Sequence, residues 1–250
     1  MVLALAGPLL QGAPASGSAT AGDPITAIQR QLVKGHGVRI TRVNTFNAGD
    51  GWERFKPTKG VVGFGDGTVK ATDLWHMQLG KTGTRIICMG GRVWEYNPQA
   101  KRPHGKIWST GKWPCDGLQT GLLRLDKPAE FAAVLATTTT TKAAGIYDGS
   151  PTTLHEGSIS FRQLWDVGAN LRGDIKDEHG EWAIDWRLWI GKDGLVRRAW
   201  SKWRQPDLLE DSTYVQGWYG FVADVRYSDW GTKVTIKPPP AARTIDLDKM

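Results

Sequence analysis

The amino-acid sequence predicts an α+β fold in which a continuous antiparallel sheet carries at least two helices. Several segments alternate apolar and polar residues with a period of two, which is typical of strands with one buried face. Glycine-rich turn signals separate these segments, and only two stretches place apolar residues at helical spacing. Because neither a fixed-period repeat nor a linker divides the chain, we expect residues 22–250 to form a single domain.

The longest strand pattern lies between Glu181 and Trp203 and predicts a tryptophan-rich β-hairpin. Its turn is expected at Lys192-Asp193-Gly194, because glycine accepts a positive φ at little cost. An apolar face this wide must be covered by a helix, a second sheet or a ligand. Four large apolar residues occupy every second position of the first strand: Trp182, Ile184, Trp186 and Leu188.

Two helices are expected. Asp23-Pro24 is a typical helix start, and the apolar stripe behind it consists of Ile25, Ile28 and Leu32. Lys34-Gly35 is the expected end of this helix. The second helix is expected to begin at Asp126-Lys127-Pro128 and to end at the β-branched run 137–141.

The remaining elements are expected to be strands joined by turns. Gly90-Gly91 predicts a hairpin between residues 85–89 and 92–96, and residues 97–121 are expected to form an ordered loop. Further strands are expected at 144–147, 154–164 and 214–227. A last strand is expected at 232–236, before three consecutive prolines that cannot donate to a ladder.

Composition restricts the partners. Lysine and arginine outnumber aspartate and glutamate by 32 to 25, which gives a formal net charge of +7 and favours anionic polymers or lipid headgroups. The basic residues are scattered, however, and form no continuous run of the kind that binds nucleic acid. The 13 tryptophans either fill a core or line a binding site. The strand face that carries Trp182 and Trp186 has no charge, which favours a core or an apolar ligand there.

The N-terminal segment and the cysteines concern the compartment. Residues 1–21 are expected to be a signal peptide or a disordered tail, and Ala19-Thr20-Ala21 fits a cleavage site before Gly22. No Lys or Arg precedes the apolar run, so the signal would be clipped or weak; we favour export. Cys88 and Cys115 would form one disulfide in an oxidising compartment and two buried thiols in a reducing one.

The motifs of common enzyme classes are absent from the sequence. It contains neither G-x-S-x-G nor H-E-x-x-H, and its five histidines are dispersed. Gly63-x-Gly65-x-Gly67 precedes a strand, whereas a phosphate-binding loop precedes a helix. We therefore expect no catalytic residues, no metal site and no cofactor, and we expect the protein not to be an enzyme.

Three segments resemble a known group of proteins. Residues 103–108 (PHGKIW) resemble a P-x-G-K-x-W box, and residues 189–198 (WIGKDGLVRR) resemble a hairpin with the pattern D-G-L-x-R-R. Residues 227–239 resemble a closing strand with the pattern Y-x-x-W-G-x-x-V-x-I-x-x-P. Together these segments resemble the secreted or lipidated envelope proteins of the LolA-like and LppX/LprG-like superfamily, without the lipobox cysteine of the anchored members.

The resemblance implies a strongly curved antiparallel half-barrel whose concave face is covered by helices, with an apolar cavity for acyl chains between them. It implies a secreted or cell-envelope protein, a monomer, that binds a lipid or acylated molecule. The expected cavity residues are Trp182, Ile184, Trp186, Leu188, Ile25, Ile28 and Leu32. The alternative is an envelope interaction module whose basic surface binds an anionic polymer, a membrane surface or a protein partner.

Overall fold

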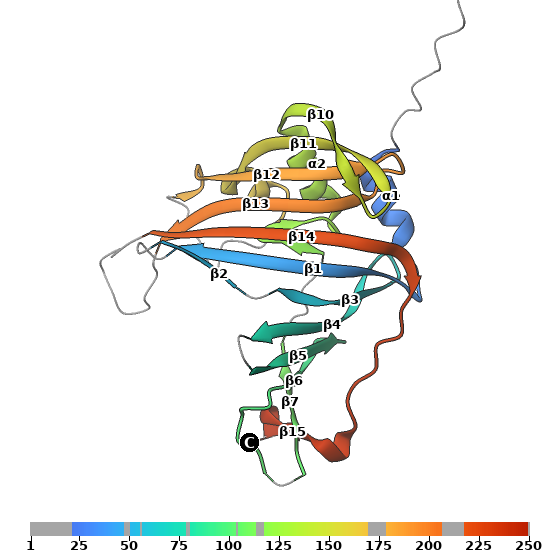
Figure 1. Ribbon diagram of the computed structural model, residues 1–250, viewed down its shortest axis with the longest axis vertical. Coiled ribbons are helices and arrows are strands. Elements are labelled where there is room, and N and C mark those ends of the chain that lie inside the picture. Colours follow the sequence, from blue (N-terminus) through green and yellow to red (C-terminus); the bar gives the residue numbers. More distant parts are fainter. Residues whose placement is uncertain are drawn as a thin grey trace, which may run out of the picture.

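The computed structural model describes residues 22–47, 51–55, 57–78, 81–103, 105–113, 118–169, 179–206 and 218–249. Within these ranges most of the chain forms one open, curved sheet with three α-helices beside it (Figure 1). The predicted signal segment, residues 1–21, lies outside the described residues. No helix in the described ranges is long and apolar enough to cross a membrane.

Strands β1 to β7 form the first part of the main sheet. Their bounds are β1 His36–Asn47, β2 Trp52–Arg54, β3 Thr58–Gly65, β4 Thr68–Gln78, β5 Lys81–Met89, β6 Arg92–Tyr96 and β7 Trp108–Lys112. Strands β10 to β14 form the other part. Their bounds are β10 Thr138–Tyr147, β11 Ser150–Ser160, β12 Ala183–Gly191, β13 Val196–Pro206 and β14 Trp218–Lys233. The two parts join where β1 pairs with β14, so the strand order is β10-β11-β12-β13-β14-β1-β3-β4-β5-β6-β7, followed by β15.

The remaining elements are short. A separate two-stranded sheet consists of β8, Gln119–Thr120, and β9, Leu123–Arg124. The helices are α1 Pro24–Gln31, α2 Pro128–Ala136 and α3 Phe161–Asp166. At the C-terminal end, β15 (Thr244–Asp246) lies between the 3-10 helices η2 (Ala241–Arg243) and η3 (Leu247–Lys249).

The predicted tryptophan-rich hairpin is confirmed as β12 and β13. Trp186 lies opposite Ser201 and Leu188 lies opposite Ala199 in an antiparallel ladder. Gly194 at the turn has a φ of 79°, which an L side chain rarely adopts. The turn is further closed by Asp193, whose Oδ1 accepts a hydrogen bond from the Leu195 amide at 3.1 Å.

The start of the first helix is also as predicted. The Asp23 carboxylate accepts hydrogen bonds from the amides of Ile25 and Thr26, so it is the N-cap of α1. Hydrogen bonds from the Thr26 hydroxyl and amide lower the pKa of Asp23. The helix ends at Gln31, earlier than the predicted Lys34-Gly35, because the amide of Leu32 already bonds Gln29 in a tightened last turn.

Two predicted strands are wrong in extent. Residues 218–233 form one long strand, β14, which includes the start of the segment predicted as a separate last strand at 232–236. Residues 161–164 are not a strand but the first turn of α3. The capping box explains α3, since the Ser160 hydroxyl accepts from the Gln163 amide while the Gln163 side chain accepts from the Ser160 amide.

The sheet is not antiparallel throughout, and the predicted loop 97–121 contains a strand. Trp108–Lys112 forms β7, which pairs with β6. After the three prolines the chain returns, and β15 pairs with β7 in parallel. Arg92 holds this return in place through ion pairs with Asp246 at 2.9 Å and Asp248 at 3.2 Å.

The hydrophobic core lies between the helices and one side of the sheet. Ile28 of α1, Phe131 of α2 and Leu164 of α3 belong to the same buried cluster as Trp186 and Leu188 of β12. Figure 1 shows α1 and α2 beside the β11–β14 part of the sheet, with no α-helix beside β4–β6. The packed core lies along β11–β14 and continues onto β1 and β3 through Val38, Val62 and Phe64. We call β10–β14 with α1–α3 the helix-packed region.

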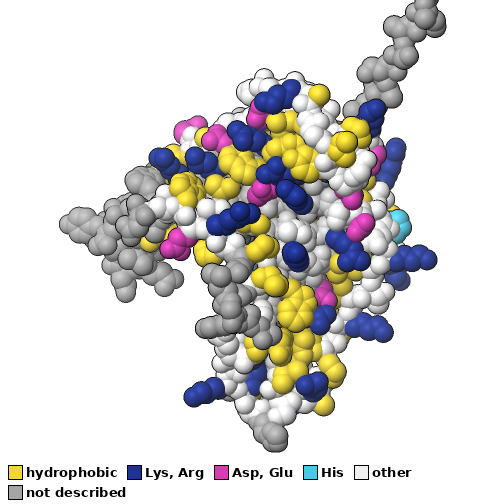
Figure 2. All heavy atoms as spheres, viewed as in Figure 1, with side chains coloured by type: hydrophobic (Ala, Val, Ile, Leu, Met, Phe, Trp, Pro, Cys, Tyr) yellow, Lys and Arg dark blue, Asp and Glu magenta, His cyan; other side chains and the backbone are white. Residues whose placement is uncertain are grey.

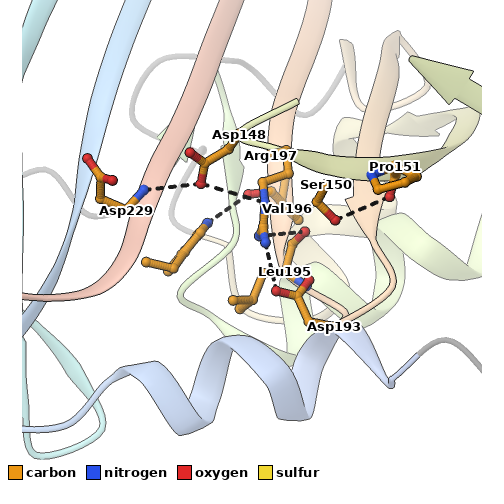
Figure 3. Close-up of polar contacts among 9 residues, drawn as sticks. Asp148, Ser150, Pro151, Asp193, Leu195, Val196, Arg197 and Asp229 are labelled. Atoms are coloured by element: carbon orange, nitrogen blue, oxygen red, sulfur yellow. Dashed lines mark hydrogen bonds and ion pairs between the residues drawn. The ribbon is translucent and has the colours of Figure 1, made fainter. Parts of the chain in front are cut away.

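The D-G-L-x-R-R segment has a structural role at the edge of this region (Figure 3). Arg197 is buried, and its guanidinium donates to Asp193 at 2.7 Å and lies 3.8 Å from Asp148. Asp148 also accepts from the amide of Asp229, at 3.2 Å. These contacts connect the β10–β11 turn, the β12–β13 turn and β14, so the motif that suggested the family stabilises the fold.

Candidate functional site

The strand register defines an inner face, on which the helices pack, and an outer face. Side chains at every second position of β12, β13, β14, β1, β3, β4, β5 and β6 follow one another across the inner face. The inner face continues beyond the helices to strands β4–β7, which we call the groove region.

A hollow of about 350 Å³ lies in the groove region, and we call it the inner groove. Its volume lies within the range of about 300–1,000 Å³ that is usual for small-molecule sites. Most of its lining comes from β4, β5, β6 and β7, with one residue from β1. The lining residues are Arg42, Thr72, Leu74, His76, Ile86, Cys88, Val93, Glu95, Ser109, Thr110, Gly111, Lys112, Trp113 and Leu247.

Two cross-strand rows make the floor of the inner groove mainly apolar. In one row Leu74 of β4 lies opposite Ile86 of β5, and Ile86 lies opposite Glu95 of β6. In the next row Cys88 lies between Thr72 and Val93. At the far rim Trp113 and Leu247 are 69% and 55% exposed, so the groove ends in apolar side chains that face solvent.

A polar row crosses the inner face beside this floor. Arg42 of β1 lies opposite Thr58 of β3, Thr58 opposite His76 of β4, and His76 opposite Thr84 of β5. The Thr58 hydroxyl and His76 Nδ1 are 3.1 Å apart and share a hydrogen bond. The inner groove therefore has a polar edge near β1 and an apolar floor.

Cys88, on the floor of the groove, is disulfide-bonded. The other cysteine of the predicted pair, Cys115, lies outside the described residues. The disulfide constrains the groove floor, because β5 cannot move far from the cysteine to which Cys88 is bonded. A disulfide is the state expected of these cysteines in an oxidising compartment.

The seven predicted cavity residues lie together, but in the packed core of the helix-packed region. Trp182 and Ile25 are half-buried against the core. The other five are at most 2% exposed: Ile28, Leu32, Ile184, Trp186 and Leu188. The indole Nε1 of Trp186 donates a hydrogen bond to the Thr137 hydroxyl at 3.1 Å, so the one polar atom of this side chain already has a partner within the protein.

Trp182 also lines a second hollow, of about 470 Å³, at the end of the long hairpin. Trp203 lines the same hollow, together with the charged side chains of Asp185, Lys202 and Arg204. His179 stacks on Trp182 with ring centroids 4.1 Å apart, and Trp203 stacks on Phe221 at 5.2 Å. Trp182 is therefore the one predicted cavity residue that lines this second hollow.

Sequence reasoning missed the inner groove, although a signal for it was present. The alternation of Thr72, Leu74 and His76 marks one face of β4, and that of Ile86 and Cys88 marks one face of β5. What could not be seen was that, within the described ranges, no α-helix would pack on these faces. In the described ranges no group of three or more His, Cys, Asp or Glu side chains is placed to hold a metal ion.

Comparison with known proteins finds similarity only among solved structures. No family model matches the chain, and no curated protein matches it. The chain is similar to LprF from Mycobacterium bovis, with 16% identity, coverage of 86% of this chain and 95% of that one, and a TM-score of 0.45. It is also similar to the lipoprotein LppX from Mycobacterium tuberculosis, with 14% identity, 86% and 98% coverage, and a TM-score of 0.43.

A LolA superfamily protein from Nitrosomonas europaea is similar over 88% of this chain and 96% of its own, with 12% identity and a TM-score of 0.30. A LolA superfamily protein is thus among the solved structures to which the chain is similar. At such low identities the likeness concerns the fold and not a ligand.

Proposed function

We propose that this protein is exported, is not an enzyme, acts as a monomer and binds a lipid or another molecule with an acyl chain, which it carries in the cell envelope. The inner groove is the observation that carries this proposal. Its floor of Leu74, Ile86 and Val93 needs no specific polar contact to hold an alkyl chain, since burial is worth about 0.8 kcal/mol per methylene.

The proposal includes a larger apolar interior. We propose that α1–α3 cover the concave face of a half-barrel and that the seven core residues around Trp186 extend the site. An acyl chain could reach Trp186 only if α1 and α2 moved away from the sheet. The packed core would then be the closed state of a cavity whose accessible part is the inner groove.

The test is binding of a fluorescent acyl probe, 11-(dansylamino)undecanoic acid, to the purified full chain, together with native mass spectrometry of the protein as isolated. Ile86→Gln puts an amide on the groove floor, whereas Ile146→Gln makes the same change at a site on β10 that is 72% exposed. We expect Ile86→Gln to weaken binding at least about tenfold, which is about 1.4 kcal/mol, and Ile146→Gln to leave it unchanged.

Far-UV circular dichroism establishes that both variants are folded before their affinities are compared. A wild-type protein that is isolated without lipid and takes up no probe would overturn the proposal. Equal affinities for the two variants would also overturn it, because the probe would then bind elsewhere on the surface.

The second candidate, an interaction module, rests on the outer face. There arginines stack on tryptophans, with Arg198 4.4 Å from the Trp189 ring centroid and Arg187 4.9 Å from that of Trp200. Figure 2 shows hydrophobic and basic side chains side by side on one face of the molecule. Such a surface suits an anionic polymer, a membrane surface or a protein partner.

The outer arginines already have acidic partners, which makes this the weaker candidate. Arg198 forms two hydrogen bonds with Asp224, and Arg187 forms an ion pair with Glu156. A surface whose charges are compensated attracts anions less strongly. The interaction module predicts that the protein is retained on a column of anionic polymer at roughly 50 mM salt and released at roughly 200 mM salt, because salt screens the attraction between exposed charges. No retention at low salt would exclude the interaction module.

A further inference from the structure

Arg42 is the residue of the inner groove that the acyl-binding proposal leaves unexplained. It lies on β1, where the helix-packed region meets the groove region, and its side chain lines the groove. Its Nε is buried, and among the described residues it has no hydrogen-bond partner. By contrast, Arg85 of β5 has a carboxylate partner, Asp73, at 2.6 Å.

An unpartnered guanidinium nitrogen in a buried place is unfavourable, because it has lost water without gaining an acceptor. Thr58, the neighbour of Arg42 on β3, shares its hydroxyl hydrogen bond with His76, and the buried Nε of Arg42 makes no bond to it. A carboxylate or phosphate group suits an arginine, since its planar donors can form two charge-assisted hydrogen bonds with one anionic group. The geometry therefore favours an anion from outside the protein.

The strand register places the charged Arg42 next to the apolar floor, just as the charged headgroup of an amphiphile is next to its apolar tail. From Arg42, the next inner-face position along β1 is Ile40, about 7 Å away at about 3.4 Å per residue. The row of Ile40 continues through Gly60 to Leu74 and Ile86. Gly60 has no side chain to interrupt the row, because a Cβ there would come within 2.0 Å of the Asp73 carbonyl oxygen.

The other charged groups of the groove lie away from Arg42. Glu95 is on β6, with β3, β4 and β5 between it and β1, and Lys112 is at the end of β7. The polar end near β1 therefore has one positive charge, and the acidic Glu95 sits where the apolar rows end. A headgroup at Arg42 and a tail over Leu74 and Ile86 avoids contact between the ligand's anion and Glu95.

We propose that Arg42 selects amphiphiles with an anionic headgroup, which it binds at the β1 edge of the inner groove while the alkyl tail lies over Leu74 and Ile86. This inference rests on the proposed acyl-binding function and names its ligand class. It makes Arg42 a specificity-determining residue.

The experiment measures the affinities of lauric acid, dodecyl phosphate and dodecanol, which share a twelve-carbon tail and differ in the headgroup, for the full chain. We expect the wild type to bind the two anions at least about tenfold more tightly than dodecanol. Arg42→Gln should lose this preference while its affinity for dodecanol stays the same. Arg42→Lys, which keeps the charge without the planar fork, should retain part of it. The ratio between the two anions shows which headgroup is preferred.

Lys112→Gln is the matched control, because it removes the other cation that lines the groove. It should leave the preference for anions intact. If the wild type binds none of the three ligands, the proposed function fails. If the wild type and Arg42→Gln bind all three with equal affinity, the proposed function stands and the role of Arg42 is refuted. Loss of preference in Lys112→Gln but not in Arg42→Gln would also refute it.

Discussion

The helix-packed region and the groove region are parts of one sheet with the same alternation of inner and outer side chains. On the inner face of the helix-packed region, Trp186 and Tyr227 are almost completely buried beneath residues of the three helices. On the inner face of the groove region no α-helix is present in the described ranges, and the floor consists of smaller side chains such as Thr72, Cys88 and Val93. Both regions bury apolar side chains, since Leu74 and Cys88 are only 5% and 3% exposed, but in the groove region a hollow lies next to them.

This difference teaches that strand patterning specifies which face is apolar but not what covers it. Large aromatic side chains fill the space between a sheet and its helices at the density of a protein interior. Small side chains without a covering helix leave space that a ligand can fill. The three predictions below test whether the two regions differ in stability and in exchange with solvent as this comparison requires.

The largest effect is expected for Trp186→Ala in the helix-packed region. Trp186 is 1% exposed, and the substitution removes its packing and its hydrogen bond to Thr137. We expect a loss of about 3–5 kcal/mol in the free energy of unfolding, measured by urea denaturation. The matched control is Trp113→Ala at the rim of the groove, where 69% exposure predicts a change within about 0.5 kcal/mol. Similar losses in both variants would show that the two regions are packed alike.

The next effect is expected from reduction of the disulfide at Cys88. Removal of a native disulfide typically costs about 2–5 kcal/mol in small secreted domains, and we expect an effect of this order here. Because Cys88 lies on the floor of the inner groove, we expect amide hydrogen exchange to increase first in β4–β7 after treatment with dithiothreitol. Exchange in β12 and β13 should change less. An equal increase in both regions would mean that the sheet opens as one unit.

The smallest effect concerns Glu130 of α2, which is buried beside the core of the helix-packed region. Burial raises the pKa of its carboxyl, although the charge of Arg124 opposes the shift. A raised pKa in the folded state means that stability is greatest in acid and falls as the pH rises through that pKa. Glu130→Gln cannot ionise, so we expect it to unfold at a higher urea concentration than the wild type at pH 7.

The advantage of Glu130→Gln should disappear as the pH falls below the ordinary glutamate value of 4.5. Urea titrations at pH 4, 5.5 and 7 measure this difference. A variant that is less stable than the wild type at pH 7 would show that the carboxylate makes favourable contacts in the core, contrary to the prediction.

Local patterns in the sequence predicted much of the helix-packed region. The cap at Asp23, the alternation around Trp186 and the turn at Gly194 are each determined by neighbours in the chain, and each is found in the structure. One failure was local: the capping box between Ser160 and Gln163 starts helix α3 where a strand was predicted. The other failure depends on distant contacts, because β15 pairs with β7 in parallel only after the chain returns past three prolines.

The candidate site shows the same division. The seven predicted residues were chosen because four of them alternate along one strand and three share one stripe of the first helix. The structure buries most of them in the core, and whether a ligand reaches them stays a prediction. Arg42, which carries the further inference, looked in the sequence like one of many scattered basic residues.

By itself the sequence determined the alternation of the strands, the glycine turns and the first helix cap, because these depend on steric and hydrogen-bonding preferences within a few residues. Only the tertiary structure decided that the helices share a core with the β11–β14 part of the sheet, and that Arg42 faces a hollow with no carboxylate partner among the described residues. The reason is that coverage and charge pairing depend on segments that are far apart in the chain, and no local preference specifies where those segments meet.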